Sequence, residues 1–152
     1  MLCRESLTIR ASNPATLHID IETAARPTGS ESKGDFNVKF LVIVNDSPWG
    51  SGLALAACRF VRAARESGEQ VSAVFFREDG IYNALEGDAI DAGTSDLAAV
   101  WTELGRTAGI RMLLCRSSWQ RRLASQPSKG FDESGLAEMI ELMLQSDRVV
   151  TF

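Results

Sequence analysis

Histidine is almost absent from this chain, and cysteine is scarce. His18 is the one histidine, and the three cysteines, Cys3, Cys58 and Cys115, lie far apart. Metal sites in proteins need several His, Cys or carboxylate ligands close together, so we expect no metal site. An odd number of scattered cysteines argues against a disulfide framework and favours a reducing compartment, which predicts a cytoplasmic protein. Cys58 falls within a helical pattern at 51–68, and we interpret it as a small core residue.

Long apolar segments are missing as well. The uninterrupted apolar runs, such as FLVIV at 40–44, are far too short to span a bilayer, so we expect no membrane segment. The first ten residues, MLCRESLTIR, contain no apolar stretch of the kind that a signal peptide needs. A chain of 152 residues with 45% hydrophobic and 24% charged residues is instead typical of one globular domain with a core.

Acidic residues are absent from one part of the chain. The range 104–131 contains six cations and no acid, so the remaining residues hold 10 cations, all 20 acids and a net charge of −10. The overall charge of −4 argues against stable nucleic-acid binding. A run of like charges usually marks a solvated helix face. This run surrounds Cys115, and an anion-attracting field near that thiol is the alternative interpretation.

The chain divides into a polar beginning and a regular remainder. Residues 1–36 include Pro14, Pro27 and the stretch TGSESKGD without sustained periodicity, so we expect a flexible N-terminal extension. An α/β domain is expected over 37–152. Strands are predicted at 38–44, 70–76, 110–115 and 147–152, and helices at 51–68, 94–109, 117–125 and 131–146, with 77–93 mainly loop.

Strands that alternate with helices predict right-handed crossovers and a mainly parallel sheet that is covered on both faces. The expected fold class is a three-layer α/β/α sandwich of the flavodoxin-like topology class. Helix 94–109 has Thr94 or Ser95 as its expected N-cap. In helix 131–146, an apolar face is predicted for Leu136, Met139, Ile140 and Met143.

The segment LLCRSSWQRR at 113–122 contains the candidate reactive group. Cys115 stands at the carboxyl end of a predicted buried strand, where open parallel sheets collect ligands and chemistry. Arg116, Arg121 and Arg122 follow within seven residues. Nearby cations and a helix N-terminus both favour thiolate over thiol. We therefore predict Cys115 as the nucleophile, with the three arginines as electrostatic support.

Two other interpretations of these segments remain open. Cys115 and Arg121 have the Cys-x5-Arg spacing of a cysteine phosphatase, whose loop cradles phosphate while the thiolate attacks. This is the least favoured alternative, because the loop interior has the bulky Trp119 and no glycine, and no acid is placed to protonate a leaving group. The loop NDSPWGSG at 45–52 leads into a helix N-terminus that could bind an anion, as in a flavodoxin-like cofactor-binding module.

Several motifs from 38 to 152 occur in a recognisable order. They are Pro48-Trp49-Gly50 after the first strand, FF-x-x-x-G-x-x-x-A from Phe75 to Ala84, the strand-end Cys115 followed by Arg121-Arg122, Gly130-Phe131, Ser134-Gly135-Leu136, and Asp147-Arg148-Val149-Val150. Together they resemble the DsrE/TusD family of sulfur-relay proteins. The resemblance implies a three-layer α/β fold, no cofactor, and a cysteine that carries sulfane sulfur as a persulfide. Cys115 occupies the position of that cysteine.

The resemblance also implies a function and partners. It implies a sulfurtransferase that relays sulfur in either sulfur oxidation or tRNA 2-thiouridine formation. Its partners would be sulfur donor and acceptor proteins, persulfide or thiol carriers such as TusA-like proteins. A non-catalytic subunit, in which Cys115 is incidental, is the alternative within the family. The residues from Arg116 to Trp119 depart from the small residues that usually follow the cysteine, so the partner or pathway can differ.

Subunit association is expected on two grounds. Relatives in this family assemble as trimers or hexamers, which implies a homo-oligomer or a hetero-oligomer with related subunits. The sequence also has apolar residues in a predicted loop, and exposed apolar patches usually mark interfaces. The residues in question are Ile81, Tyr82, Leu85 and Ile90.

Overall fold

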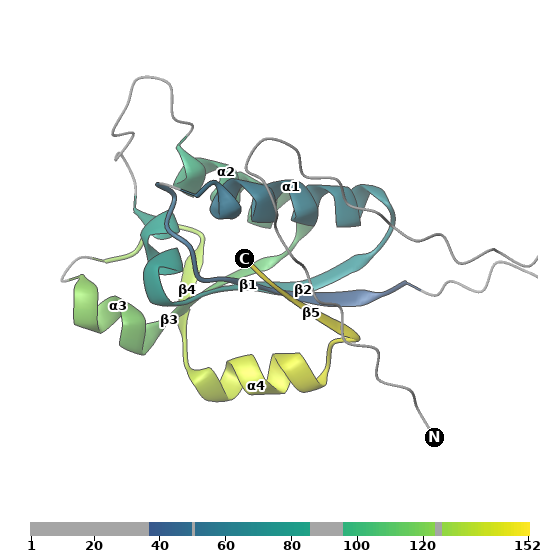
Figure 1. The fold of residues 1–152 in the computed structure, drawn as a ribbon. Coiled ribbons are helices and arrows are strands. Elements are labelled where there is room, and N and C mark those ends of the chain that lie inside the picture. The colour runs from purple at the N-terminus through teal and green to yellow at the C-terminus, as the bar shows by residue number, and fades with distance from the viewer. Residues whose placement is uncertain (1–36, 50, 86–95, 124–125) are drawn as a thin grey trace, which may run out of the picture. The chain divides into compact units, whose positions relative to one another are not determined.

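A five-stranded parallel sheet forms the centre of the computed structural model, which describes residues 37–49, 51–85, 96–123 and 126–152. The strands are β1 (Lys39–Val44), β2 (Gln70–Phe76), β3 (Arg111–Cys115), β4 (Phe131–Ser134) and β5 (Arg148–Thr151). Every neighbouring pair is parallel, and the strand order is β4-β3-β2-β1-β5 (Figure 1). The α/β fold class is confirmed. The extension predicted at 1–36 lies outside the described residues and stays a prediction.

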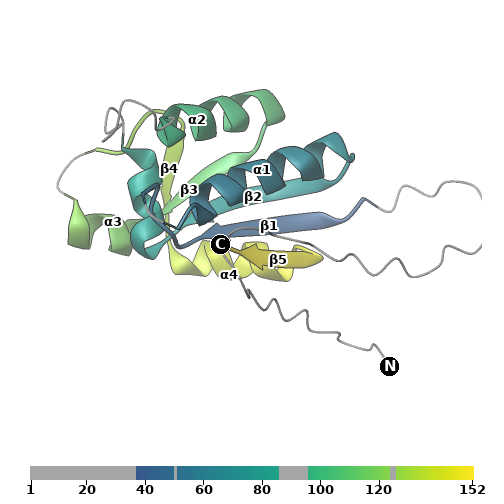
Figure 2. The same cartoon turned by 45° about the horizontal axis from the view of Figure 1, so that its top comes forward.

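Helices cover both faces of this sheet, as Figures 1 and 2 show. Helices α1 (Leu53–Glu66) and α2 (Leu97–Ala108) lie on one face, and α4 (Leu136–Leu144) lies on the other. The chain moves across the sheet from β1 to β4 and then returns to β5 beside β1. Right-handed crossovers place helices on opposite faces for opposite directions of travel, which explains the three layers. In the described part of the chain, no helix has the length and apolar character that a membrane crossing requires.

Alternate residues of the central strands point into two separate cores. Val42 and Phe76 belong to the larger core, together with the buried sides of α1 and α2. Leu41 and Phe75, their chain neighbours, face α4. This alternation is the period of two that any strand imposes on its side chains. The core under α4 consists of Leu41, Ile43, Ala73, Phe75, Leu113, Cys115, Met139 and Leu142.

The region predicted as one helix at 131–146 contains a strand and a shorter helix. Residues 131–134 form β4, which pairs with β3 from Met112↔Phe131 to Cys115↔Ser134. The helix predicted from the hydrophobic period was wrong for residues 131–134, because a long-range strand pairing overrides local propensity. The four apolar residues predicted on one face of this helix differ in burial. Met139 is buried, but Ile140 is 54% exposed.

Two further expectations need correction. The segment expected to be mainly loop contains a 3-10 helix, η1 (Glu78–Ala84), which buries Ile81 completely. The N-cap of α2 is Asp96, whose carboxylate accepts a hydrogen bond from the Ala99 amide at 3.2 Å. The predicted caps at 94–95 lie outside the described residues.

Candidate active site

Cys115 stands where β3 changes directly into α3 (Arg116–Arg122). The apolar run before it is buried on both faces of the sheet, which explains why it forms an inner strand. Cys115 itself has extended backbone and is the N-cap residue of α3. The first amides of a helix have no partner within the helix. A thiol at this junction therefore lies next to unused hydrogen-bond donors.

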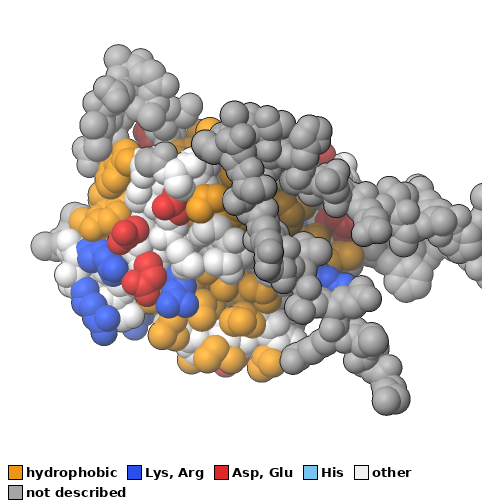
Figure 3. Space-filling model, in the orientation of Figure 1, with side chains coloured by type: hydrophobic (Ala, Val, Ile, Leu, Met, Phe, Trp, Pro, Cys, Tyr) orange, Lys and Arg blue, Asp and Glu red, His pale blue; other side chains and the backbone are white. Residues whose placement is uncertain are grey.

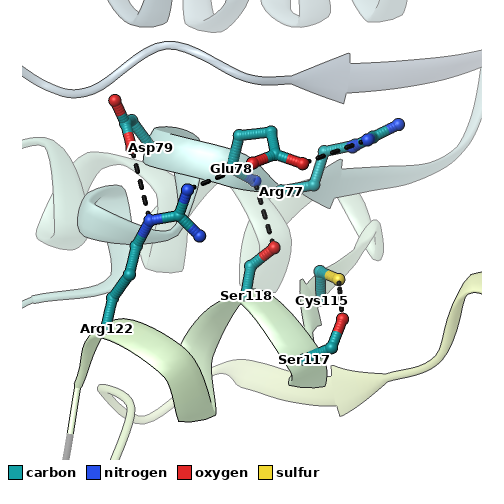
Figure 4. Close-up of polar contacts among 7 residues, drawn as sticks. All are labelled: Arg77, Glu78, Asp79, Cys115, Ser117, Ser118 and Arg122. Atoms are coloured by element: carbon teal, nitrogen blue, oxygen red, sulfur yellow. Dashed lines mark hydrogen bonds and ion pairs between the residues drawn. The ribbon is translucent and has the colours of Figure 1, made fainter.

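Ser117 and Ser118, two and three residues after Cys115, supply such donors. The Cys115 sulfur lies 3.3 Å from the Ser117 hydroxyl oxygen (Figure 4), and only 3% of Cys115 is exposed. Burial raises the pKa of the Cys115 thiol, but the nearby hydroxyls and backbone amides of Ser117 and Ser118 outweigh this effect. The net effect is a pKa below the ordinary value. Hydrogen bonds to the charged form of a group favour that form, so this environment favours thiolate.

The arginines near the thiol are bound to carboxylates from other segments. Arg116 Nε lies 3.1 Å from Glu133 of β4. Arg122 makes ion pairs of 3.1 and 3.4 Å with Glu78 and Asp79 of η1 (Figure 4). Figure 3 shows Lys and Arg side chains next to Asp and Glu side chains on this side of the molecule. The positive field expected from the acid-free stretch is thus offset by acids that the fold brings to it.

The predicted electrostatic role of Arg116, Arg121 and Arg122 stays a prediction, and the structure adds other groups that act on the thiol. The groups that lower the pKa of Cys115 are Ser117 and Ser118, and the arginines are not among them. Arg121 is exposed and has no ion pair in the part of the chain that the structure describes. The sequence signal for the serines was their position in the first turn after a strand-end cysteine, which sequence reasoning took only as a departure from the family pattern.

Helix η1 packs against both the sheet end and α3. Gly80 allows this packing, because a Cβ at that position would lie 2.0 Å from the Val44 carbonyl oxygen. The Glu78 amide donates to the Ser118 hydroxyl oxygen at 3.3 Å. Asn83 is buried and donates from Nδ2 to the Asp46 and Gly80 carbonyl oxygens at 3.0 and 2.9 Å. These contacts hold the loop after β1, η1 and the start of α3 together around the thiol.

The phosphatase alternative does not fit this geometry. Residues 116–122 form a helix rather than a loop that wraps an oxyanion. The late amides of that helix are used in helical hydrogen bonds, and the Leu123 amide donates to the Trp119 carbonyl oxygen at 2.8 Å. Trp119 is buried in the larger core. Among the described residues, no group of three or more His, Cys, Asp or Glu side chains is placed to hold a metal ion.

These observations define a small three-layer α/β protein with a hydrogen-bonded thiol at the carboxyl end of an inner strand. The chain belongs to the DsrE/DsrF-like family, whose model matches residues 38–152. The resemblance found in the sequence motifs is confirmed.

The similar proteins agree with this assignment. The chain is 30% identical over 128 residues to the sulfurtransferase TusD homologs of Vibrio vulnificus strains YJ016 and CMCP6. Each alignment covers 76% of this chain and 98% of the relative. Among solved structures, the ychN protein from E. coli matches with a TM-score of 0.66 and 23% identity. That match covers 76% of this chain and 99% of the other, and it shows the shared fold.

Proposed function

We propose that this protein is a sulfur-relay sulfurtransferase in which Cys115 carries sulfane sulfur as a persulfide. The observation that carries the proposal is the thiol at the end of β3, which lies 3.3 Å from the Ser117 hydroxyl oxygen and has a lowered pKa. Membership of the DsrE/DsrF-like family and the similarity to TusD homologs support the same chemistry. A phosphatase or a cofactor-binding module has no comparable support.

The transfer requires two exchanges at sulfur. In loading, the Cys115 thiolate attacks the terminal sulfur of a donor persulfide, so that one S–S bond forms, the donor S–S bond breaks, and the donor leaves as a thiolate. In delivery, an acceptor thiolate attacks the terminal sulfur on Cys115, and Cys115 leaves as a thiolate. Neither exchange has a net change of oxidation state. Hydrogen-bond donors that stabilise the Cys115 thiolate help Cys115 both as the nucleophile in loading and as the leaving group in delivery.

The burial of Cys115 limits which partners can reach it. With 3% of the residue exposed, only a slender group can approach the sulfur. The proposed partners are therefore polysulfide, or donor and acceptor proteins such as TusA-like carriers that present a cysteine on an extended segment. We place the protein in the cytoplasm, because a free thiol such as Cys115 persists in a reducing compartment. The proposal covers both tRNA 2-thiouridine formation and sulfur oxidation.

We also propose that the chain associates with copies of itself or with related subunits. The residues first expected to support this do not, because Ile81 is fully buried and Tyr82 and Leu85 are partly buried. Ile90 lies outside the described residues. Support comes instead from α4, where apolar side chains gather on the surface (Figure 3). The exposed fractions are 47% for Leu136, 54% for Ile140, 39% for Met143 and 83% for Leu144.

Association is measured by light scattering at micromolar concentration. We expect an oligomer for the wild type and a smaller species for Ile140→Glu combined with Leu144→Glu. A monomeric wild type would rule out self-association.

Sulfur loading tests the main proposal. Purified protein is treated with polysulfide or a persulfidated donor protein, and the mass of the intact chain is measured before and after a reductant. The wild type should gain the mass of one or more sulfur atoms and lose it on reduction. Cys115→Ser should abolish the gain, while Cys58→Ser and Cys3→Ser keep most of it. Equal loading of the wild type and Cys115→Ser would refute the carrier role, and an unloaded wild type would favour the non-catalytic subunit.

A further inference from the structure

The Ser117 hydroxyl is in direct contact with the reactive sulfur. Its oxygen lies 3.3 Å from Cys115 Sγ, within hydrogen-bond distance for sulfur, and Figure 4 shows this contact between the two side chains. The two residues differ in exposure, because Cys115 is 3% exposed whereas Ser117 is an exposed residue of α3. Ser117 is therefore a group that touches the buried sulfur and also faces solvent.

The chemical state of the sulfur sets the direction of this hydrogen bond. In the thiol, either the sulfur or the hydroxyl oxygen can be the donor. A thiolate has no hydrogen, so the Ser117 hydroxyl must donate and the sulfur must accept when Cys115 is ionised. A hydrogen bond to an ionised group is roughly twice as strong as one between neutral groups. The contact is therefore strongest in the state of Cys115 that attacks a donor persulfide.

Loading moves the negative charge outward but leaves it within reach of the same hydroxyl. A sulfur–sulfur bond is about 2.0 Å long, so the added sulfur lies nearer to Cys115 Sγ than the Ser117 oxygen does. Rotation about one side-chain bond moves the serine oxygen between its staggered positions, and its hydrogen rotates to suit the acceptor. Because Ser117 is exposed, a packed core does not confine this rotation. One hydroxyl can thus serve the charge at both positions.

The charged side chains near the thiol are engaged with one another. Arg116 pairs with Glu133 at 3.1 Å, Arg122 pairs with Glu78 at 3.1 Å and Asp79 at 3.4 Å, and Arg111 pairs with Glu138 at 2.6 Å. These pairs are exposed or partly exposed, and such pairs act weakly on a neighbouring group. A neutral donor in contact with the sulfur therefore has the advantage over them.

We propose that Ser117 is a catalytic residue of sulfur transfer, whose hydroxyl donates first to the Cys115 thiolate and then to the terminal sulfur of the persulfide. In loading, the hydrogen bond stabilises the attacking thiolate. In delivery, it draws negative charge from the terminal sulfur. An acceptor thiolate attacks that sulfur, and the sulfur–sulfur bond breaks with its electron pair on Cys115.

The hydrogen stays on Ser117 in both exchanges, so Ser117 transfers no proton and neither exchange has a net change of oxidation state. The inference rests on the proposed function and deepens it, because it assigns a second group to the same site.

Two variants of Ser117 and one control test this role. Ser117→Ala removes the hydroxyl, Ser117→Thr keeps it, and Gln120→Ala changes another exposed residue of α3. The full-length chain is alkylated with iodoacetamide from pH 5.5 to 10, and Cys115 is followed by peptide mapping. Ser117→Ala should raise the midpoint of the pH profile by about one unit, the size expected when a charged group loses one hydrogen bond. Ser117→Thr and Gln120→Ala should keep the wild-type midpoint.

A second measurement follows delivery. Each protein is loaded with polysulfide, freed of excess reagent and mixed with mercaptoethanol as the acceptor, while the intact mass records the loss of sulfur. Ser117→Ala should release sulfur about tenfold more slowly than the wild type, because the terminal sulfur and the leaving Cys115 thiolate lose their donor. Ser117→Thr should restore the release.

The outcomes separate this inference from the proposed function. A wild-type midpoint for Ser117→Ala, or equal losses in Ser117→Ala and Ser117→Thr, would overturn the role of the hydroxyl. A raised midpoint with unchanged release would overturn its part in delivery. A wild type that takes up no sulfur would refute the proposed function, and the alkylation profiles would still decide whether Ser117 donates to the thiolate.

Discussion

Cys58 and Cys115 are both almost inaccessible, with exposed fractions of 1% and 3%, yet their thiol pKa values are shifted in opposite directions. Burial raises the pKa of Cys58 to about 12, and the charge of Arg62 opposes this only weakly. The pKa of Cys115 is lowered, because Ser117 and Ser118 outweigh the effect of its burial. Burial alone therefore does not decide whether a thiol is inert.

The difference follows from where each cysteine lies along the backbone. Cys58 is in the middle of α1, where the neighbouring amides already donate to carbonyls four residues earlier. Cys115 precedes the first turn of α3, where amides have no helical partner and serine hydroxyls are adjacent. Hydrogen-bond donors that no other group uses lower the pKa of one buried thiol, whereas the other is a core residue with a raised pKa.

Selective alkylation gives the largest expected contrast between the two thiols. With a pKa of about 12, Cys58 has a very small thiolate fraction at pH 7.5, and thiolate is the reacting form. Cys115 should react with iodoacetamide faster than Cys58 by about a thousandfold or more. Peptide mapping after timed quenching measures both rates. In denaturant the two rates should become equal, and equal rates in the folded protein would contradict the comparison.

Gly80→Ala should damage the site of Cys115 and leave that of Cys58 intact. The new Cβ would lie 2.0 Å from the Val44 carbonyl oxygen, and that oxygen belongs to the backbone and cannot turn aside as a side chain would, so η1 must move. We expect the free energy of unfolding to fall by about 3 kcal/mol and Cys115 alkylation to slow. Urea unfolding and alkylation rates measure these effects. Gly135→Ala is the control, because nothing lies within 4 Å of its added Cβ.

The pH dependence of stability should separate the two thiols by sign. Cys58 has a folded pKa of about 12 and a reference value of 9.0, so above pH 9 the unfolded chain loses this proton first. The free energy of unfolding should therefore decrease by about 1.4 kcal/mol per pH unit above pH 9, and Cys58→Ala should remove this slope. Urea unfolding between pH 8 and 10.5 measures it.

The lowered pKa of Cys115 predicts the opposite behaviour. Its contribution to stability is present above the unfolded pKa and is lost as pH falls through the folded pKa. Between the folded pKa of Cys115 and pH 9, the free energy of unfolding of the wild type should therefore rise with pH. Cys115→Ala should remove this rise. If the free energy of unfolding has the same pH dependence in Cys58→Ala and Cys115→Ala, the two thiols do not differ in pKa as described.

Local pattern predicted much of this fold correctly. The runs at 38–44 and 70–76 became β1 and β2 within one residue, because a continuous β-branched run suits a strand that is buried on both faces. The residues of β4 were mistaken for a helix start, since four residues with two acids have no strand signal until β3 pairs with them. Ile81 looked like an exposed loop residue because a 3-10 helix is too short to show a hydrophobic period.

The candidate site was predictable to a similar degree. Sequence alone determined that Cys115 ends an inner strand and that serines begin the next turn, because these are properties of adjacent residues. It could not assign the partners of the arginines. Glu133 lies 17 residues from Arg116, and Glu78 lies 44 residues from Arg122. These carboxylates offset the positive charge that was predicted from the acid-free stretch.

Only the tertiary structure decided which distant segments meet beside the thiol. The Glu78 amide and the Ser118 hydroxyl are 40 residues apart, and they meet because η1 packs at the carboxyl end of the sheet beside α3. Charges and hydrogen-bond donors act over a few ångströms, whereas sequence shows only their spacing along the chain. The sequence thus indicated which sulfur to test, and the fold determined which charges around it are paired.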